Sequence, residues 1–304
     1  MKSWADKWFS VQKETIRFPS NFVSNVEGFD FLSQILTRTV AKKKFLLDFS
    51  AVQRFDPHLS AVIGCIIIAS ERYEATFEFS GLNNEFVKKT IKNNGLMELV
   101  DGTKRPSNFN SGIPFQRFDM KSESSLEEYI YRYLLLTGKD FNLSEGAKKR
   151  IFRSIFEIYQ NSVMHSGAEE VFVCGHKFTL RGVLALTMVE IGRTFKDNVT
   201  SFEDVYKRYS ASESISWAVK SGNTTKKATE TGGLGLDLIR EFLRMNHGKL
   251  QIRSAEGYWE EKKGIIFTQN SPHHFGGSIV NMEFNLRDSK TYYTKEEFEI
   301  KDIL

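Results

Sequence analysis

Short apolar runs alternate with amphipathic segments through the first third of this 304-residue chain. In chain order the patterns predict a strand, a helix, a strand, a helix, a strand and a helix, at residues 14–18, 28–41, 45–49, 56–73, 76–79 and 84–94. The strand at 45–49 (FLLDF) is apolar throughout, as expected of a strand that is covered on both faces. Strands that alternate with helices in this way favour an α/β sheet.

The polar segment 101–111 is rich in turn-forming residues and separates this region from a second one with a different pattern. We expect a first domain at residues 1–118 and a second at 119–304. In the second domain the patterns predict helices at 125–136 and 144–164, a hairpin at 170–176 and 183–189, pieces of helix within 201–220, a helix that ends at Asn246, and strands at 249–254, 264–269 and 278–286. We expect the pair His273-His274 to lie in a loop, since no further ligand stands at metal-binding spacing.

The composition is that of a globular protein, with 40% hydrophobic and 26% charged residues. The net charge of +4 does not by itself indicate a nucleic-acid partner. Cys65 and Cys174 lie in apolar stretches, which predicts buried thiols. The longest apolar run, 61–69, is shorter than the roughly 20 residues that span a bilayer, and the N-terminus lacks the apolar core of a signal peptide. We therefore expect a cytoplasmic protein without a membrane partner.

Three polar residues follow one another at helical spacing in the segment FEIYQNSVMHS. Glu157, Asn161 and His165 stand at i, i+4 and i+8, which places them on one face of a helix. A carboxylate and an amide one turn apart can both contact a hydrated Mg²⁺ ion, which prefers oxygen ligands. The same pattern is also typical of an ordinary solvated helix face.

The segment MVEIGRTF carries an acid and a glycine at the end of an apolar strand. The carboxylate of Glu190 could accept a hydrogen bond from an exocyclic amine, and Gly192 would allow a planar base to approach the backbone. An ordinary strand and turn would have the same sequence.

A glycine-rich segment stands directly before the predicted helix that ends at Asn246. Free backbone amides at a helix start bind anions, and Gly232, Gly233 and Gly235 would let a phosphate come close. The preceding Thr225 and Lys226 could belong to a mobile, cationic lid over the phosphates. No Lys-Ser/Thr follows the last glycine and no strand directly precedes the first, which argues against a Walker A loop and a dinucleotide fingerprint.

In this order the three segments resemble the motifs of the GHKL superfamily, which includes the ATP-binding part of DNA gyrase, MutL, histidine-kinase ATP-binding domains and anti-sigma-factor kinases. Glu157-x-x-x-Asn161-x-x-x-His165 resembles its N box, Glu190-x-Gly192 its first glycine box, and the segment 232–236 its second. Gly277-Ser278 resembles the Gly-Thr pair before its last strand. The resemblance covers residues 124–287 and implies a two-layer α/β sandwich with a mixed sheet.

The resemblance also implies ATP and Mg²⁺ as ligands. Glu157 would be the catalytic residue that orients or deprotonates the attacking group, Asn161 would bind Mg²⁺, and Glu190 would face the adenine amine. The residues it assigns to nucleotide binding are Asn161, His165, Glu190, Gly192, Thr194, Thr225, Lys226, Gly232, Gly233, Leu234, Gly235, Leu236 and Ser278. Two positions depart from the family pattern: Glu190 replaces an Asp and Thr194 replaces a Gly, so the base-binding side is less well matched than the phosphate side.

The segment FLLDFSAVQRFDPHLSAVIGC in the first domain resembles a STAS domain, the fold of anti-sigma-factor antagonists. The resemblance covers residues 14–100. In regulatory STAS domains a Ser or Thr follows the Asp and accepts a phosphate, whereas here Pro57 follows Asp56. His58 and Ser60 are the nearby candidates, but an ordinary helix start with Asp56 as its N-cap is the favoured interpretation.

The combined prediction is an α/β (α+β) protein in which a STAS-like βα domain precedes a GHKL domain. We expect it to be an ATP- and Mg²⁺-dependent ATPase or kinase whose nucleotide state controls a protein partner. One alternative is a serine or histidine protein kinase of the anti-sigma type, and another is a non-catalytic adaptor with a degenerate nucleotide site. A role in stress or phage defence would rest on fold analogy alone. A homodimer is plausible for both families, although no residue indicates one.

Overall fold

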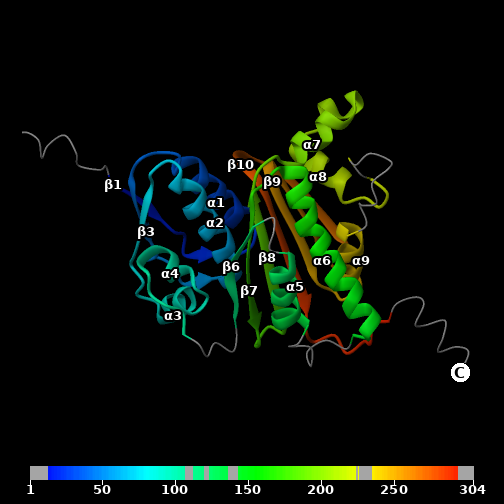
Figure 1. Cartoon of the computed structure of the whole chain (residues 1–304), viewed down its shortest axis with the longest axis horizontal. Coiled ribbons are helices and arrows are strands. Elements are labelled where there is room, and N and C mark those ends of the chain that lie inside the picture. Colours follow the sequence, from blue (N-terminus) through cyan, green and yellow to red (C-terminus); the bar gives the residue numbers. More distant parts are fainter. Residues whose placement is uncertain are drawn as a thin grey trace, which may run out of the picture.

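A computed structural model of the chain describes residues 13–106, 112–119, 123–135, 143–223, 225 and 235–293. These residues form a mixed α/β structure with four layers, which Figure 1 shows from left to right. A three-stranded sheet is followed by a pair of helices, then by a five-stranded sheet and finally by a second layer of helices. No described helix is both long enough and apolar enough to cross a membrane.

The first sheet is built from the predicted alternation of strands and helices in the N-terminal third. Its strands are parallel in the order β1-β3-β5, and α1 and α2 are the crossovers between them. The elements of this unit are β1 (Lys13–Arg17), β2 (Asn21–Phe22), α1 (Val26–Arg38), β3 (Lys44–Asp48), β4 (Arg54–Phe55), α2 (Ser60–Glu71), β5 (Thr76–Ser80), α3 (Glu85–Asn93) and α4 (Leu96–Asp101). The predicted βα pattern of this region is therefore confirmed, with β2 and β4 forming an additional short parallel pair.

Helix α2 is apolar on all sides because it lies between the two sheets. Every residue from Ser60 to Ile67 is buried, and a helix that is hydrophobic all round belongs inside a core. Its neighbours on one side are strands of the first sheet, and on the other side they include Phe172 and Cys174 of the second. At Gly64 the approach is so close that a Cβ atom would lie 2.4 Å from the Phe115 ring.

The second sheet has the strand order β6-β7-β8-β10-β9. Its strands are β6 (Gly112–Asp119), β7 (Glu170–Phe178), β8 (Val183–Ile191), β9 (Lys249–Lys262) and β10 (Ile265–Asn285). Each neighbouring pair among these described strands is antiparallel, so the prediction of a mixed sheet is wrong for this part of the chain. The sheet begins at Gly112, which lies N-terminal to the expected division between residues 118 and 119.

The second helical layer packs on the face of this sheet that points away from α1 and α2 (Figure 1). Its helices are α5 (Glu123–Ile130), which continues as a π-helical turn (Tyr131–Leu135), α6 (Glu145–Ser166), α7 (Phe195–Phe202), α8 (Ala211–Ala218) and α9 (Gly235–Met245). Helix α6 begins after the N-cap Ser144, whose side chain accepts from the Ala147 amide, and ends at Gly167 with a φ of 65°. Glycine is favoured at such a left-handed position.

Alternating side chains of the second sheet supply both of the cores. In β7, Val171 and Val173 belong to the core with α5, α6 and α9, whereas Phe172 and Cys174 belong to the core with α1 and α2. This division follows from the two-residue period of a strand. Because both faces are covered, β7 and β8 are nearly continuous apolar runs, and the N-terminal unit shares its core with the sheet of the C-terminal unit. Both cysteines are buried thiols, as predicted.

Strands β9 and β10 form one long hairpin in place of the short strands predicted from the sequence. At Ala255 the backbone has a φ of 50° and β9 bends. The bend returns the second half of the strand to the first, so that Gln251 Nε2 lies 2.8 Å from a carboxylate oxygen of Glu260. The prediction of a loop at His273-His274 is wrong, since both residues lie in β10. Within the described residues, no group of three acids, histidines or cysteines could hold a metal ion.

Candidate functional site

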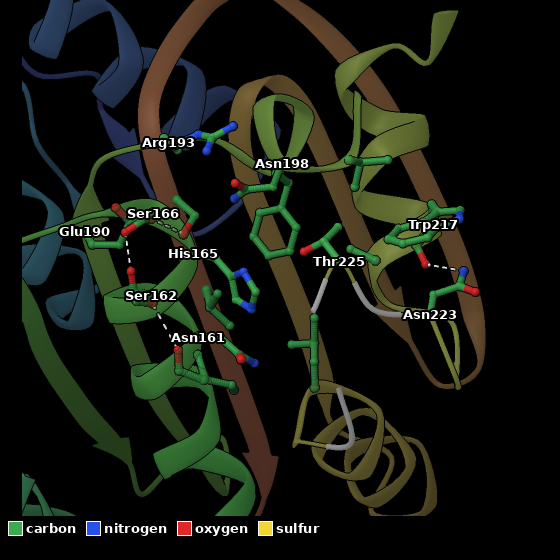
Figure 2. Close-up of a pocket in the computed structure, with 17 residues that line it drawn as sticks. Asn161, Ser162, His165, Ser166, Glu190, Arg193, Asn198, Trp217, Asn223 and Thr225 are labelled. Atoms are coloured by element: carbon green, nitrogen blue, oxygen red, sulfur yellow. Dashed lines mark hydrogen bonds between the residues drawn. The ribbon is translucent and has the colours of Figure 1, made fainter. Parts of the chain in front are cut away.

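A cavity of about 110 Å³ opens between the C-terminal half of α6, the end of β8, an interior part of β10, and the helices α7 and α8 (Figure 2). The residues that line it are Ile158, Asn161, Ser162, His165, Ser166, Glu190, Arg193, Phe195, Asn198, Val199, Trp217, Ala218, Asn223, Thr225, Leu236, Ser278 and Val280. It therefore brings together residues of all three segments that the sequence singled out.

Helix α6 contributes one polar face to the cavity. Figure 2 shows Asn161 and His165 pointing into it, one helical turn apart. Both residues come from the predicted i, i+4, i+8 series. Glu157, the first member of that series, stands one turn earlier in α6 and is not among the lining residues. The proposed catalytic carboxylate thus lies next to the cavity and not in its wall.

Glu190 lines the cavity and is almost fully buried, with 1% of the residue exposed. It stands opposite Ser278 in the antiparallel register of β8 and β10, and the Ser278 hydroxyl donates to its Oε1 at 2.6 Å. Burial raises the pKa of Glu190 to about 7, although the Ser278 hydrogen bond favours the charged form and works in the opposite direction. The side chain is therefore poised between its two protonation states near neutral pH.

The second carboxylate oxygen of Glu190, Oε2, is buried and has no hydrogen-bond partner among the residues that the structure describes. The hydroxyl of Ser166 lies beside it but donates its proton to the Ser162 carbonyl. A buried acceptor without a donor is costly, and buried polar atoms in native proteins normally have partners. The arrangement is therefore suited to a ligand group that donates a hydrogen bond at this point.

Gly192 and Thr194 have roles in the fold, and neither lines the cavity. A Cβ atom on Gly192 would lie 2.6 Å from the Ser166 carbonyl oxygen, so the glycine allows the end of β8 to pass the end of α6. Thr194 is the N-cap of α7 and forms a capping box with Asp197, in which its hydroxyl accepts from the Asp197 amide. The Thr194 hydroxyl also donates to Oδ2 of Asp197 at 2.7 Å.

The glycine-rich segment is only partly described. Thr225 and Leu236 line the cavity, and Gly235 is the first residue of α9. The remaining predicted residues of this segment lie outside the described residues: Lys226, Gly232, Gly233 and Leu234. The described neighbours place the two ends of the segment at the cavity.

Several lining residues were not among the sequence-based candidates, in particular Arg193, Phe195, Asn198, Trp217 and Asn223. Figure 2 shows Trp217 and Asn223 across the cavity from Asn161, joined by a 2.8 Å hydrogen bond from Asn223 Nδ2 to the Trp217 carbonyl. Helices α7 and α8 begin with capping boxes, which the sequence displays as T-x-x-D and S-x-x-E. That pattern could have located both helices, although not which side chains face the cavity.

The candidate phosphate acceptors of the N-terminal unit, His58 and Ser60, are not accessible. His58 and Ser60 are fully buried, and Ser60 Oγ accepts from Asn94 Nδ2 at 2.7 Å. Asp56 is the N-cap residue of the helical turn Pro57–Leu59, but its side chain makes no capping hydrogen bond. Its Oδ2 accepts instead from the amide and the hydroxyl of Ser24, both at 2.9 Å. The predicted helix start, with Asp56 at the N-cap position and Pro57 in the first turn, is therefore confirmed, while the Asp56 carboxylate stabilises the connection before α1.

Comparison of the sequence with models of protein families and with curated proteins gives no match.

Proposed function

We propose that the cavity binds ATP together with Mg²⁺ and that the protein is a GHKL-like ATPase or kinase whose nucleotide state controls a protein partner. The observation that carries this proposal is Oε2 of Glu190, a buried oxygen of a lining residue that has no hydrogen-bond partner among the described residues. An exocyclic amine such as that of adenine would donate to this oxygen, while Ser278 continues to donate to Oε1. The same carboxylate would repel a carbonyl oxygen at that position, which favours adenine over guanine.

The walls of the cavity suit a nucleotide with its base held inside. Ile158, Val280 and Phe195 supply apolar surface near Glu190, as ligand pockets commonly do around a few placed polar groups. Asn161 and His165 also line the cavity, are only partly buried, and offer an amide and an imidazole. In the proposal the Asn161 amide oxygen holds the Mg²⁺ ion, and the Mg²⁺ ion neutralises charge on the phosphates.

The proposed control of a partner uses the shared sheet. Ser278 contacts Glu190 on the cavity side, while the next residue in β10, Ile279, belongs to the core with α1 and α2. A ligand that shifts the Glu190–Ser278 pair would therefore act on a strand that also contacts the N-terminal unit. We propose that this unit presents the partner-binding surface.

Isothermal titration calorimetry with ATP·Mg²⁺ tests the binding proposal. We expect Glu190→Gln to weaken binding about 30-fold, since a lost hydrogen bond to a charged group is worth roughly 2 kcal/mol. The variant presents one amide –NH₂ group where the wild type has an acceptor. Glu71→Gln, an exposed glutamate at the end of α2, is the matched control and should bind as the wild type does.

Two further measurements complete this test. GTP·Mg²⁺ should bind more weakly than ATP·Mg²⁺ to the wild type, and Asn161→Ala should reduce the dependence of ATP affinity on Mg²⁺. The absence of any heat with the wild-type protein, or equal heats for the wild type and Glu190→Gln, would refute the proposal.

The role of Glu157 separates binding from turnover. Because this residue is one turn from Asn161 but outside the cavity lining, we propose that it acts on the attacking group and contributes little to affinity. Glu157→Gln should then lower the rate of phosphate release at least tenfold with less than a twofold change in ATP affinity. An unchanged rate would assign the chemistry to another residue.

A further inference from the structure

A second and larger cavity, of about 700 Å³, lies at the opposite end of β8 from Glu190. It is formed by the turn between β7 and β8, the adjoining ends of β9 and β10, and the returning tip of the β9–β10 hairpin. Its lining contains six basic side chains: Arg181, His247, Lys249, Lys262, Lys263 and Arg287. Among the described residues that line it, Glu283 is the only carboxylate.

Two of these cations are held in place by ion pairs. Lys249 is 12% exposed, and its Nζ lies 2.7 Å from Glu283 Oε1 and 3.4 Å from the Ser24 carbonyl. The Arg181 guanidinium lies 3.6 Å from the centre of the Phe178 ring and 3.5 Å from Asp56. These two positive groups are thus fixed at the floor of the cavity before any ligand binds.

A third cation is fixed by the backbone. Arg287 donates from Nη2 to the Leu180 carbonyl, and its side chain lies across Gly182. A Cβ atom at Gly182 would be 2.4 Å from Arg287 Cγ, and the backbone φ there is 62°. Glycine at this turn therefore leaves room for the arginine, which has no carboxylate partner within the described part of the chain.

The hairpin tip supplies the remaining charge. Lys262 and Lys263 are exposed and form no ion pair with any residue that the structure describes. The bend at Ala255 returns them to the end of the sheet, where they face the cavity. Holding like charges together is unfavourable in the absence of a counter-charge, so the site is best satisfied by an anion.

We propose that this cavity binds a small phosphorylated molecule with several negative charges. Its volume lies in the range of small-molecule sites, and lysine and arginine together are the usual ligands of phosphate groups. The lining carries five Lys and Arg side chains against one carboxylate, which leaves a net charge of +4, equal to the formal net charge of the whole chain. The remainder of the protein is then neutral overall, and a neutral remainder does not favour a nucleic-acid backbone, which needs an extended basic surface.

Calorimetry of the full chain with inorganic tripolyphosphate, without Mg²⁺, tests the proposal. We expect one equivalent to bind, with at least tenfold weaker affinity for the double variant Lys262→Ala/Lys263→Ala. The matched control is Lys88→Ala/Lys89→Ala, two adjacent lysines on α3 outside this cavity, which should bind as the wild type does. Both pairs are exposed, so the variants are expected to fold, and circular dichroism checks this.

A variant that removes a negative charge, and should therefore increase the affinity, sharpens the test. Glu283→Gln removes the one negative charge of the lining and should tighten tripolyphosphate binding severalfold. Glu190→Gln and Asn161→Ala, which alter the first cavity, should leave this binding unchanged, so the two sites are distinguished. The proposal is overturned by the absence of binding to the wild type, by equal affinity for the Lys262/Lys263 variant, by loss of binding in Glu190→Gln, or by tighter binding of a single-stranded oligonucleotide.

Discussion

The two faces of the five-stranded sheet differ in whether their buried polar groups have hydrogen-bond partners. On the face toward α1 and α2, Thr187 donates to Asn281, Asn281 donates to Gln251, and Gln251 donates to the Ser24 carbonyl, at 2.9, 2.7 and 2.9 Å. On the face toward α6, Glu190 has one oxygen that is partnered and one that is not. Saturated polar groups define how layers fit together, whereas an unsaturated one leaves a place for a ligand.

Substitutions of buried polar groups on the face toward α1 and α2, where these groups have partners, should cause the larger losses in the free energy of unfolding. Arg253 of β9 has a fully buried side chain that donates to Ser33 at 3.2 Å, contacts Asp30 at 3.4 Å and donates to the Glu256 carbonyl at 3.1 Å. Arg253→Met leaves these acceptors without their donor. We expect a loss of about 3–5 kcal/mol in the free energy of unfolding, measured by urea denaturation.

The control for this variant is Arg72→Met, because Arg72 is exposed directly after α2 and its guanidinium lies 5.0 Å from the centre of the adjacent Tyr73 ring. It should change the free energy of unfolding by less than 1 kcal/mol. A loss below 1 kcal/mol for Arg253→Met would mean that the packing of α1 against β9 does not depend on this network.

On the face toward α6, replacing the buried polar group should raise the free energy of unfolding and not lower it. Because the pKa of Glu190 is raised from 4.5 to about 7, the folded protein binds more protons than the unfolded chain between these values. The buried, protonated side chain of Glu190 therefore makes its full contribution to the free energy of unfolding below pH 4.5, and this contribution is lost as the pH rises through 7. Glu190→Gln removes this loss, so the variant should gain up to about 3 kcal/mol over the wild type above pH 7.

Parallel urea titrations of wild type and Glu190→Gln at pH 5 and pH 8 measure this difference. Comparing the two proteins at each pH cancels the titration of other groups. ATP affinity of the wild type should also fall below pH 7, since the amine donor needs the ionised carboxylate. A stability difference that is the same at both pH values would show that Glu190 titrates normally.

Local sequence patterns predicted the parts of the fold whose causes are local. The strand and helix alternation of the first third, the β7–β8 hairpin and the long helix α6 were all found from periodicity. The antiparallel pairing of the second sheet was not, because strand direction depends on which strands become neighbours. The bend at Ala255 was also missed, since a left-handed alanine has no sequence signature.

The lining residues that belong to sequence motifs could be predicted, but those that approach the cavity from other elements of the fold could not. Asn161, His165, Glu190 and Ser278 came from motifs, and they line one cavity. Trp217 and Asn223 approach from α8 and the turn after it, where no motif marks the direction of a side chain. The large basic cavity was missed for the same reason, as its lysines and arginines are scattered over more than 100 residues of sequence.

Thr194 tests whether a motif position serves the fold or the ligand. Its hydroxyl accepts from the Asp197 amide at 3.1 Å as the N-cap of α7. Thr194→Ala should therefore lower the free energy of unfolding by about 1 kcal/mol and leave ATP affinity within twofold of the wild type. Thr194→Ser keeps the cap and should recover most of that stability. A tenfold loss of ATP affinity in Thr194→Ala but not in Thr194→Ser would assign the hydroxyl to the nucleotide.

His58 is the exception on the saturated face, and it gives the smallest effect. The side chain is fully buried against the Phe178 ring, and neither ring nitrogen has a hydrogen-bond partner in the part of the chain that the structure describes. Burial is the main cause that lowers its pKa, so the folded protein protonates His58 less readily than the unfolded chain, which takes up a proton there as the pH falls below about 6.5. His58→Leu should therefore be neutral or stabilise by up to about 1 kcal/mol at pH 8, with a larger gain at pH 5. Asn281 lies on the same face and has hydrogen-bond partners, so Asn281→Leu should lower the free energy of unfolding at both pH values. If His58→Leu destabilised as strongly as Asn281→Leu, His58 would belong with the partnered groups and the contrast between the two faces would be complete.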